Sequence, residues 1–173
     1  MQSGLNTAKR GIAAAKPVEM MDTIASRLSA LGLTLPVAPQ PVANYTAALV
    51  SGEWLFISGQ MSVTGDRRAL TGILGQTATI EDGQEAARCC ALNILAQAKA
   101  ALGSLERIGQ ILRLTGYVAS TPAFTDHPKV LNGASDLLVA VLGDAGRHTR
   151  AAVGVASLPL GCAVEIDAIL KVR

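Results

Sequence analysis

The stretch RAAVGVASLPLGCAVEID, which runs from Arg150 to Asp167, is the most informative part of this 173-residue chain. It contains two runs typical of β-strands, separated by Leu158-Pro159 and a glycine-containing turn. At a period of two residues, Arg150 shares a strand face with three small residues, Ala152, Gly154 and Ala156. Because a guanidinium is costly to remove from water, an arginine in this setting is typical of a site that holds an anion.

The second run carries a carboxylate on a polar face. Val164, Ile166 and Ala168 fall on one side of the predicted strand, and Glu165 and Asp167 fall on the other. We expect the two runs to form a hairpin, which would place Glu165 near Arg150. The same alternation also fits a surface arginine at a strand start and a solvated sheet face, so the residues alone leave both interpretations open.

The composition narrows the class of protein. Half of the residues are hydrophobic but only 3% are aromatic, so we expect a single domain with a core of Ala, Val, Leu and Ile. The net charge of +2, the scattered Lys and Arg residues and the few aromatic rings argue against a nucleic-acid partner. No apolar run approaches the ~20 residues that a membrane span needs, so we expect no membrane partner either.

Cysteine and histidine usage predicts neither a metal site nor a disulfide. Cys89, Cys90 and Cys162 lack metal-binding or redox spacing, which favours a reducing, cytoplasmic location. A reactive thiol remains an alternative, although no neighbouring base is evident. His127 and His148 are too few for a histidine metal cluster, and we expect both in loops. We therefore predict no cofactor.

The pattern along the chain predicts a leader and one α+β domain. We expect residues 1–20 to be a flexible leader, either an organelle-targeting segment or added sequence, and residues 21–173 to form the domain. Asp22 is the predicted cap of a short helix. One sheet with helices on one face would leave its other face to be covered by another subunit. The predicted elements are helices at 22–32, 80–102 and 130–142, strands at 46–50, 54–58 and 111–119, a short strand at 69–73, and the final strand pair.

Two blocks of sequence together resemble a known family. Arg150, Leu158-Pro159 and Val164-Glu165-Ile166 form one block, and NYTAALVSGEWLFISGQ, residues 44–60, forms the other. They resemble the RidA/YjgF family of enamine/imine deaminases, also known as the endoribonuclease L-PSP family, over about residues 44–173. The resemblance implies the chorismate-mutase-like fold, a single sheet with two helices on one face, here with an extra N-terminal helix. It also implies a homotrimer with ligand clefts between subunits.

The resemblance further implies a reaction and its catalytic residues. A 2-enamino or 2-imino acid would be hydrolysed to a 2-keto acid and ammonia without a cofactor. Arg150 would hold the substrate carboxylate in its planar fork, and Glu165 would position or activate the attacking water. Such imines hydrolyse unaided, so anchoring one beside a placed water is enough for catalysis.

Four substrate-binding positions carry over from the family as well. Tyr45 would line the cleft, Gly59 would offer its carbonyl to the substrate nitrogen, and Asn132 would contact the ligand. Ala152 stands where deaminating members have a cysteine, which widens the pocket. Tyr45 could instead cap the core, Asn132 could serve only the helix start, and Gly59 could serve only its turn.

Departures from the family pattern keep other functions open. Ala152 and a lengthened loop at 124–132 that contains Pro128 indicate a divergent subgroup with a different or larger substrate. One alternative is a binding or regulatory protein that senses a small carboxylate through Arg150 without turnover. The residues favour an endoribonuclease least, because a basic cleft and stacking aromatics are missing from the pattern.

Overall fold

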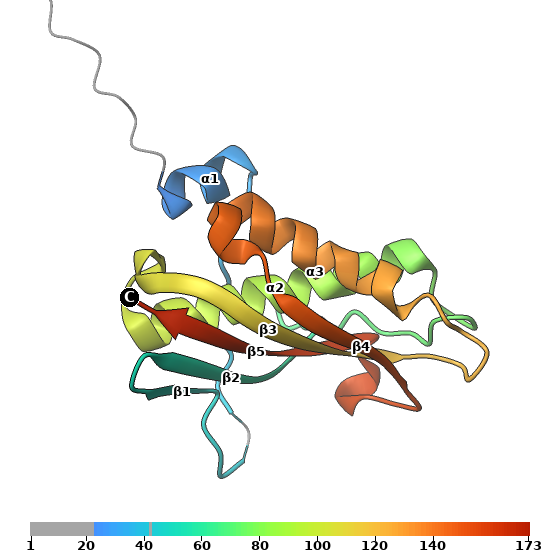
Figure 1. Ribbon diagram of the computed structural model, residues 1–173. Helices are drawn as coiled ribbons and strands as arrows, with labels where there is room; N and C mark the ends of the chain where they lie inside the picture. The colour runs from blue at the N-terminus through green and yellow to red at the C-terminus, as the bar shows by residue number, and fades with distance from the viewer. Residues whose placement is uncertain (1–22, 42) are drawn as a thin grey trace, which may run out of the picture.

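The computed structural model describes residues 23–41 and 43–173, in which one five-stranded sheet has the strand order β1-β2-β5-β3-β4. Both long helices lie on the same face of this sheet, and the short first helix packs at the end of α3 (Figure 1). This is the expected α+β fold. The elements are α1 (Ile24–Ala30), β1 (Ala48–Ser51), β2 (Trp54–Met61), α2 (Ile80–Leu102), β3 (Ile108–Ala119), α3 (His127–Leu142), β4 (Thr149–Val155) and β5 (Val164–Val172).

Helix α2 has the bounds that the sequence predicts, because local signals define both ends. Thr79 is the N-cap, and its hydroxyl accepts from the backbone N–H of Asp82 while the Asp82 carboxylate accepts from the N–H of Thr79. Gly103 ends the helix with a left-handed φ of 80°. Five alanines between these ends are buried, Ala86, Ala87, Ala91, Ala96 and Ala98, and α3 packs closely against α2.

The first helix is also present where it was expected. Its N-cap is Thr23, which forms a capping box with Ser26. The predicted cap, Asp22, and the predicted leader at 1–20 lie outside the described residues. Within residues 23–41 and 43–173, no helix combines the length and apolar character needed to cross a membrane.

The predicted final hairpin is wrong. Strand β4 pairs in parallel with β3 at the sheet edge, and β5 pairs antiparallel with both β2 and β3 (Figure 1). Strand β3 therefore lies between the two strands that were expected to be neighbours. Burial explains the order, because β5 buries a whole apolar face, whereas β4 has small, partly exposed residues suited to an edge.

The register of β3 with β4 and β5 shows which face of the sheet each residue of β4 and β5 occupies. Leu114 of β3 is buried under the helices and pairs with Arg150, so Arg150 points to the helix side. Tyr117 of β3 pairs with Glu165 on the opposite, open face. That open face also exposes large apolar side chains, among them Leu49, Trp54, Phe56 and Val153.

Two smaller predictions differ from the structure. Residues 69–73 form isolated bridges, Val63 with Ala69 and Thr71 with Cys162, instead of a strand. His127 is the first residue of α3 and not a loop residue, because α3 begins three residues earlier than its apolar pattern suggested. His148 does lie in a loop, between a short 3-10 turn and β4.

Candidate functional site

The guanidinium of Arg150 is held by three acceptors on α3. Its Nη1 donates to Oγ of Ser135 at 2.9 Å, and its Nη2 donates to the carbonyl of Pro128 at 3.0 Å and to Oδ1 of Asn132 at 2.8 Å. Among the described residues, the Nε–H and the second Nη1 N–H donate to no other group. Arg150 is therefore fixed in position while it keeps donors for an anion.

A histidine supports this arginine from behind. Nδ1 of His148 donates to the carbonyl of Gly146, and its Nε2 lies 3.0 Å from Oγ of Ser135. Because the carbonyl can only accept, the neutral ring carries its proton on Nδ1 and Nε2 accepts from Ser135. Burial, and to a lesser degree the charge of Arg150, lower the pKa of His148. A neutral His148 thus orients Ser135, and Ser135 in turn orients Arg150.

Asn132 and Ala152 lie beside this arginine. The amide oxygen of Asn132 faces Arg150, which leaves its Nδ2 group as a donor on the same side. Ala152 follows Arg150 on the helix face of β4 and pairs with Gly116 of β3. The helix face of β4 therefore offers a donor-rich group at Arg150 and small side chains beyond it.

Glu165 lies in a separate group on the open face, against the bend in β2. The pairing of β2 with β5 shifts register between Ile57 and Gln60, so Gly59 falls in an irregularity. A Cβ built on Gly59 would lie 2.8 Å from Cδ of Glu165 and nearer still to its Oε1. Gly59 is thus the residue that gives the Glu165 carboxylate its room.

The surroundings of Glu165 favour its protonated form. Partial burial, followed by the negative charge of Asp167, raises the pKa of Glu165 above its usual value. Asp167 also accepts a hydrogen bond from the hydroxyl of Tyr117 at 3.1 Å. A half-buried carboxyl with a raised pKa holds a proton more readily than an exposed one, which suits it to proton transfer.

Tyr45 lies near the Glu165 group and not near Arg150. It precedes β1, is 51% exposed, and adjoins Thr46, whose carbonyl accepts from Oγ of Ser58 at 2.7 Å. Ser58 is the neighbour of Gly59, so the backbone that follows Tyr45 lies beside β2 at its irregularity. Its exposure argues against the interpretation that it caps the core.

The six predicted site residues therefore form two groups of three. Arg150, Asn132 and Ala152 face the helices at the edge strand, whereas Glu165, Gly59 and Tyr45 belong to the other group. Two strand spacings, about 10 Å, and the thickness of the sheet separate Arg150 from Glu165. One small ligand cannot touch both residues within a single chain.

Sequence reasoning missed the residues that support these groups. Ser135 lies three positions after Asn132, so both fall on one face of α3, and this helical spacing is the signal that could have found it. His148 and Asp167 each stand two residues from a predicted catalytic residue, but neither carries a signal in sequence that separates it from an ordinary polar residue.

The cysteines offer no activated thiol. Burial raises the pKa of Cys89 to about 11 and that of Cys90 well above its usual value. Burial also raises the pKa of Cys162. A thiol that stays protonated is a poor nucleophile. In the described part of the chain, no three His, Cys, Asp or Glu side chains are grouped to hold a metal ion.

Comparison with known proteins identifies the family. Residues 25–169 match the model of the YjgF/chorismate mutase-like proteins, a family to which endoribonuclease activity is ascribed. The chain belongs to the YjgF family. Protein TCP17 of Trypanosoma cruzi is 45% identical over 151 residues, which cover 87% of this chain and 94% of TCP17.

Solved structures of YjgF-family proteins have the same fold. The Agrobacterium tumefaciens protein Atu1372, whose function is unknown, is 49% identical with a TM-score of 0.81, over 87% of this chain and 92% of its own. RidA of Psychrobacter is 29% identical with a TM-score of 0.55, over 78% of this chain and 94% of its own. E. coli TdcF with bound serine is 27% identical with a TM-score of 0.57, over 79% of this chain and 94% of its own.

Proposed function

We propose that this YjgF-family protein hydrolyses 2-imino or 2-enamino acids to 2-keto acids and ammonia. The observation that carries the proposal is the fixed guanidinium of Arg150, which keeps unused donors beside the donor amide of Asn132. Each of these free donors, and the Nδ2 group of Asn132, can hydrogen-bond one oxygen of a carboxylate. The likeness to RidA and to TdcF, which was crystallised with an amino acid, supports a small substrate of this kind.

The chemistry places modest demands on the protein. Water attacks the imine carbon, the C–N bond breaks, and the nitrogen leaves as ammonia after receiving protons. In this proposal Arg150 anchors the carboxylate, and Glu165 transfers both protons of the water to the nitrogen. The first moves as the water attacks, and the second moves as the hydroxyl becomes the ketone oxygen and the C–N bond breaks. The raised pKa of Glu165 suits a group that must both accept and release a proton.

The proposal requires two copies of the chain, because Arg150 and Glu165 lie on opposite faces of one sheet. Large apolar side chains exposed on the open face, such as Phe56 at 42% and Leu49 at 55%, favour burial against another copy. We therefore propose a homo-oligomer, as a trimer, in which Arg150 of one copy faces Glu165 of the next.

An oxidase assay with mixed oligomers tests both parts. An amino-acid oxidase generates imines, and semicarbazide traps those that the protein does not hydrolyse. The wild-type protein should lower the amount of imine that semicarbazide traps. The Arg150→Ala and Glu165→Gln variants should leave that amount unchanged. Oligomers assembled from both variants together should recover part of the activity, since some interfaces then combine two intact residues. Failure of every mixture to exceed the single variants would overturn the shared site.

A second candidate is a carboxylate-binding protein without turnover. The separation of Glu165 from Arg150 within one chain favours it, because Arg150 and Asn132 alone can bind an anion. Calorimetry with pyruvate would then show binding that is lost in Arg150→Ala, while wild type would leave imine trapping unchanged.

The charges near Arg150 argue against RNA cleavage. Lys129 pairs with Asp126 at 3.0 Å, and Arg147 pairs with Asp144 at 3.3 Å, so neighbouring cations are locally neutralised. RNA binding depends on a track of available cations. We therefore expect no cleavage of single-stranded RNA under conditions in which imine hydrolysis is measured.

A further inference from the structure

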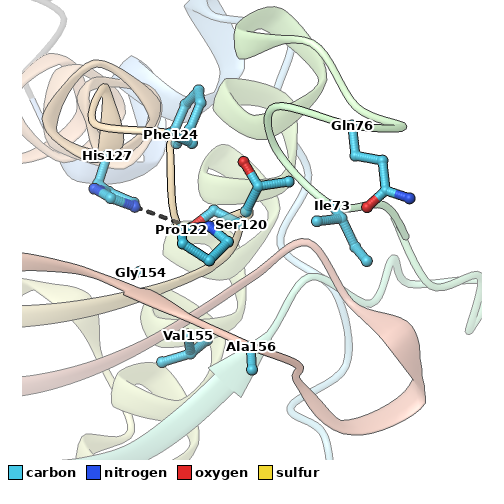
Figure 2. A pocket seen from close by; sticks show the side chains of 10 residues that line it. Ile73, Gln76, Ser120, Pro122, Phe124, His127, Gly154, Val155 and Ala156 are labelled. Atoms are coloured by element: carbon cyan, nitrogen blue, oxygen red, sulfur yellow. Dashed lines mark hydrogen bonds between the residues drawn. The ribbon is translucent and has the colours of Figure 1, made fainter.

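A cavity of about 500 Å³ opens beside the end of β4 (Figure 2). Its walls come from Gly154, Val155 and Ala156, from the segment 120–124 that follows β3, and from His127 at the start of α3. The family resemblance assigned no function to these residues, apart from the length of the 124–132 loop.

The cavity continues the strand face that carries Arg150. Arg150, Ala152 and Gly154 alternate along the helix face of β4, so only small residues lie between the arginine and the cavity. Arg150 and Gly154 are about 13 Å apart along the strand. The guanidinium covers part of that span, because its Nη2 reaches the carbonyl of Pro128, the neighbour of His127.

A polar pair lies directly over the strand at this point. Nε2 of His127 is 3.0 Å from Oγ of Ser120, and the His127 ring packs edge-on against Phe124 (Figure 2). A Cβ built on Gly154 would lie 2.7 Å from Oγ of Ser120 and nearer still to Nε2 of His127. A glycine inside a strand weakens it, and here it admits the close approach of this pair.

The cavity lining combines apolar side chains with uncharged polar ones. Apolar walls such as Ile73, Phe124 and Val155 alternate with the amide of Gln76 and the Ser120–His127 pair. Within the described part of the chain, no Asp, Glu, Lys or Arg side chain lines the cavity. A charged ligand group would thus lose water without gaining an opposite charge. A neutral side chain with an apolar stem and a hydrogen-bonding tip suits this lining.

We infer that this cavity is the subsite for the side chain of the substrate, and that it selects neutral 2-imino acids of intermediate size. The inference rests on the proposed function, since Arg150 must hold the carboxylate of the same molecule. His127 and Ser120 would bind the polar tip, and Ala156 would limit the length.

The test compares imines made from alanine, methionine, glutamine, glutamate and lysine. The glutamine and methionine imines should have kcat/KM at least tenfold above those of glutamate and lysine. Ala156→Leu, which narrows the cavity, should lower the ratio of methionine to alanine kcat/KM at least tenfold. Ser157→Leu adds the same side chain one residue away, outside the lining, and should leave that ratio unchanged.

The outcomes separate the subsite from the reaction. If all imines have equal kcat/KM, or if Ala156→Leu and Ser157→Leu change the methionine-to-alanine ratio equally, the subsite is refuted and the reaction is not. If no imine is hydrolysed, the reaction fails, and calorimetry with pyruvate, 4-methyl-2-oxopentanoate and 2-oxoglutarate still tests the cavity. Tighter binding of 4-methyl-2-oxopentanoate that Ala156→Leu abolishes would support the subsite, and equal binding of all three keto acids would refute it.

Discussion

Gly59→Ala should inactivate the protein by moving the Glu165 carboxylate while leaving the fold intact. The added Cβ would lie 2.8 Å from Cδ of Glu165, where ordinary contact begins at 3.4 Å. Cδ must therefore retreat by about 0.6 Å, and Oε1, which is nearer, by more than about 1 Å. The atoms that must move are the end of a flexible side chain, so relief requires no shift of the backbone.

The expected loss of activity follows from this displacement. Misplacing a reacting group by about 1 Å can cost about 100-fold in rate, or about 2.7 kcal/mol of barrier. The entropy that alanine removes from the unfolded chain, about 0.4–1 kcal/mol, offsets the cost of moving the side chain. We expect kcat/KM in the oxidase assay to fall about 100-fold, and the free energy of unfolding to stay within about 1 kcal/mol of wild type.

Two comparisons make this prediction refutable. Gly65→Ala is the matched control, because its built Cβ meets only Pro36, with the nearest atom at 3.4 Å, and it should behave as wild type. The double variant Gly59→Ala/Glu165→Gln should lose no more activity than Glu165→Gln alone, since both act through one carboxylate. Additive losses, or full activity in Gly59→Ala, would show that the position of Glu165 does not matter.

Asp167→Asn should lower the pKa of Glu165, because it removes the negative charge that helps burial to raise it, and the acid limb of the kcat/KM profile should move to lower pH. If the acid limb does not move, it reports the titration of a group other than Glu165. The pKa of His148 is lowered in the fold, so its contribution to stability is present above its unfolded pKa of about 6.5 and is lost as pH falls through its folded pKa. Urea unfolding from pH 7 to 5 should therefore show a shallower loss of stability in His148→Gln than in wild type, and equal slopes would contradict this. Ser135→Ala removes one hydrogen bond to the charged guanidinium of Arg150 and should raise KM about tenfold with kcat little changed; a fall in kcat alone would argue against a role in positioning Arg150.

Local signals made much of the fold predictable. The acidic first turn and Gly103 defined α2, and strict alternation defined the buried face of β5. Alternation says which face a side chain occupies, but it does not say which strand is the neighbour. The placement of β5 between β2 and β3 depends on how much apolar surface each strand must bury across the whole sheet, and that comparison goes beyond a single window of sequence.

The site was predictable to the same degree. Alternation placed Arg150 on one strand face with Ala152 and Gly154 but did not show that this face lies under the helices. The spacing of Arg150 to Leu158-Pro159 and Glu165 carried the family resemblance. Its partners were not predictable, because the three acceptors for Arg150 come from another element, α3, whose packing over β4 is a property of the folded domain. The carbonyl of Pro128 has no signature in the sequence, and Ser135 is signalled only by its helical spacing from Asn132.

The separation of Arg150 and Glu165 links the proposed activity to assembly. A chain that carried both residues on one face could act as a monomer, and its rate per chain would not depend on concentration. Here the intervening strand β3 and the opposite orientations of the two side chains exclude that arrangement. Activity per chain should consequently fall on dilution below the dissociation constant of the oligomer, while binding of a keto acid to the Arg150 group should weaken less. In the proposed oligomer, a neighbouring copy would supply the Glu165 carboxylate that the single chain cannot bring to its own Arg150.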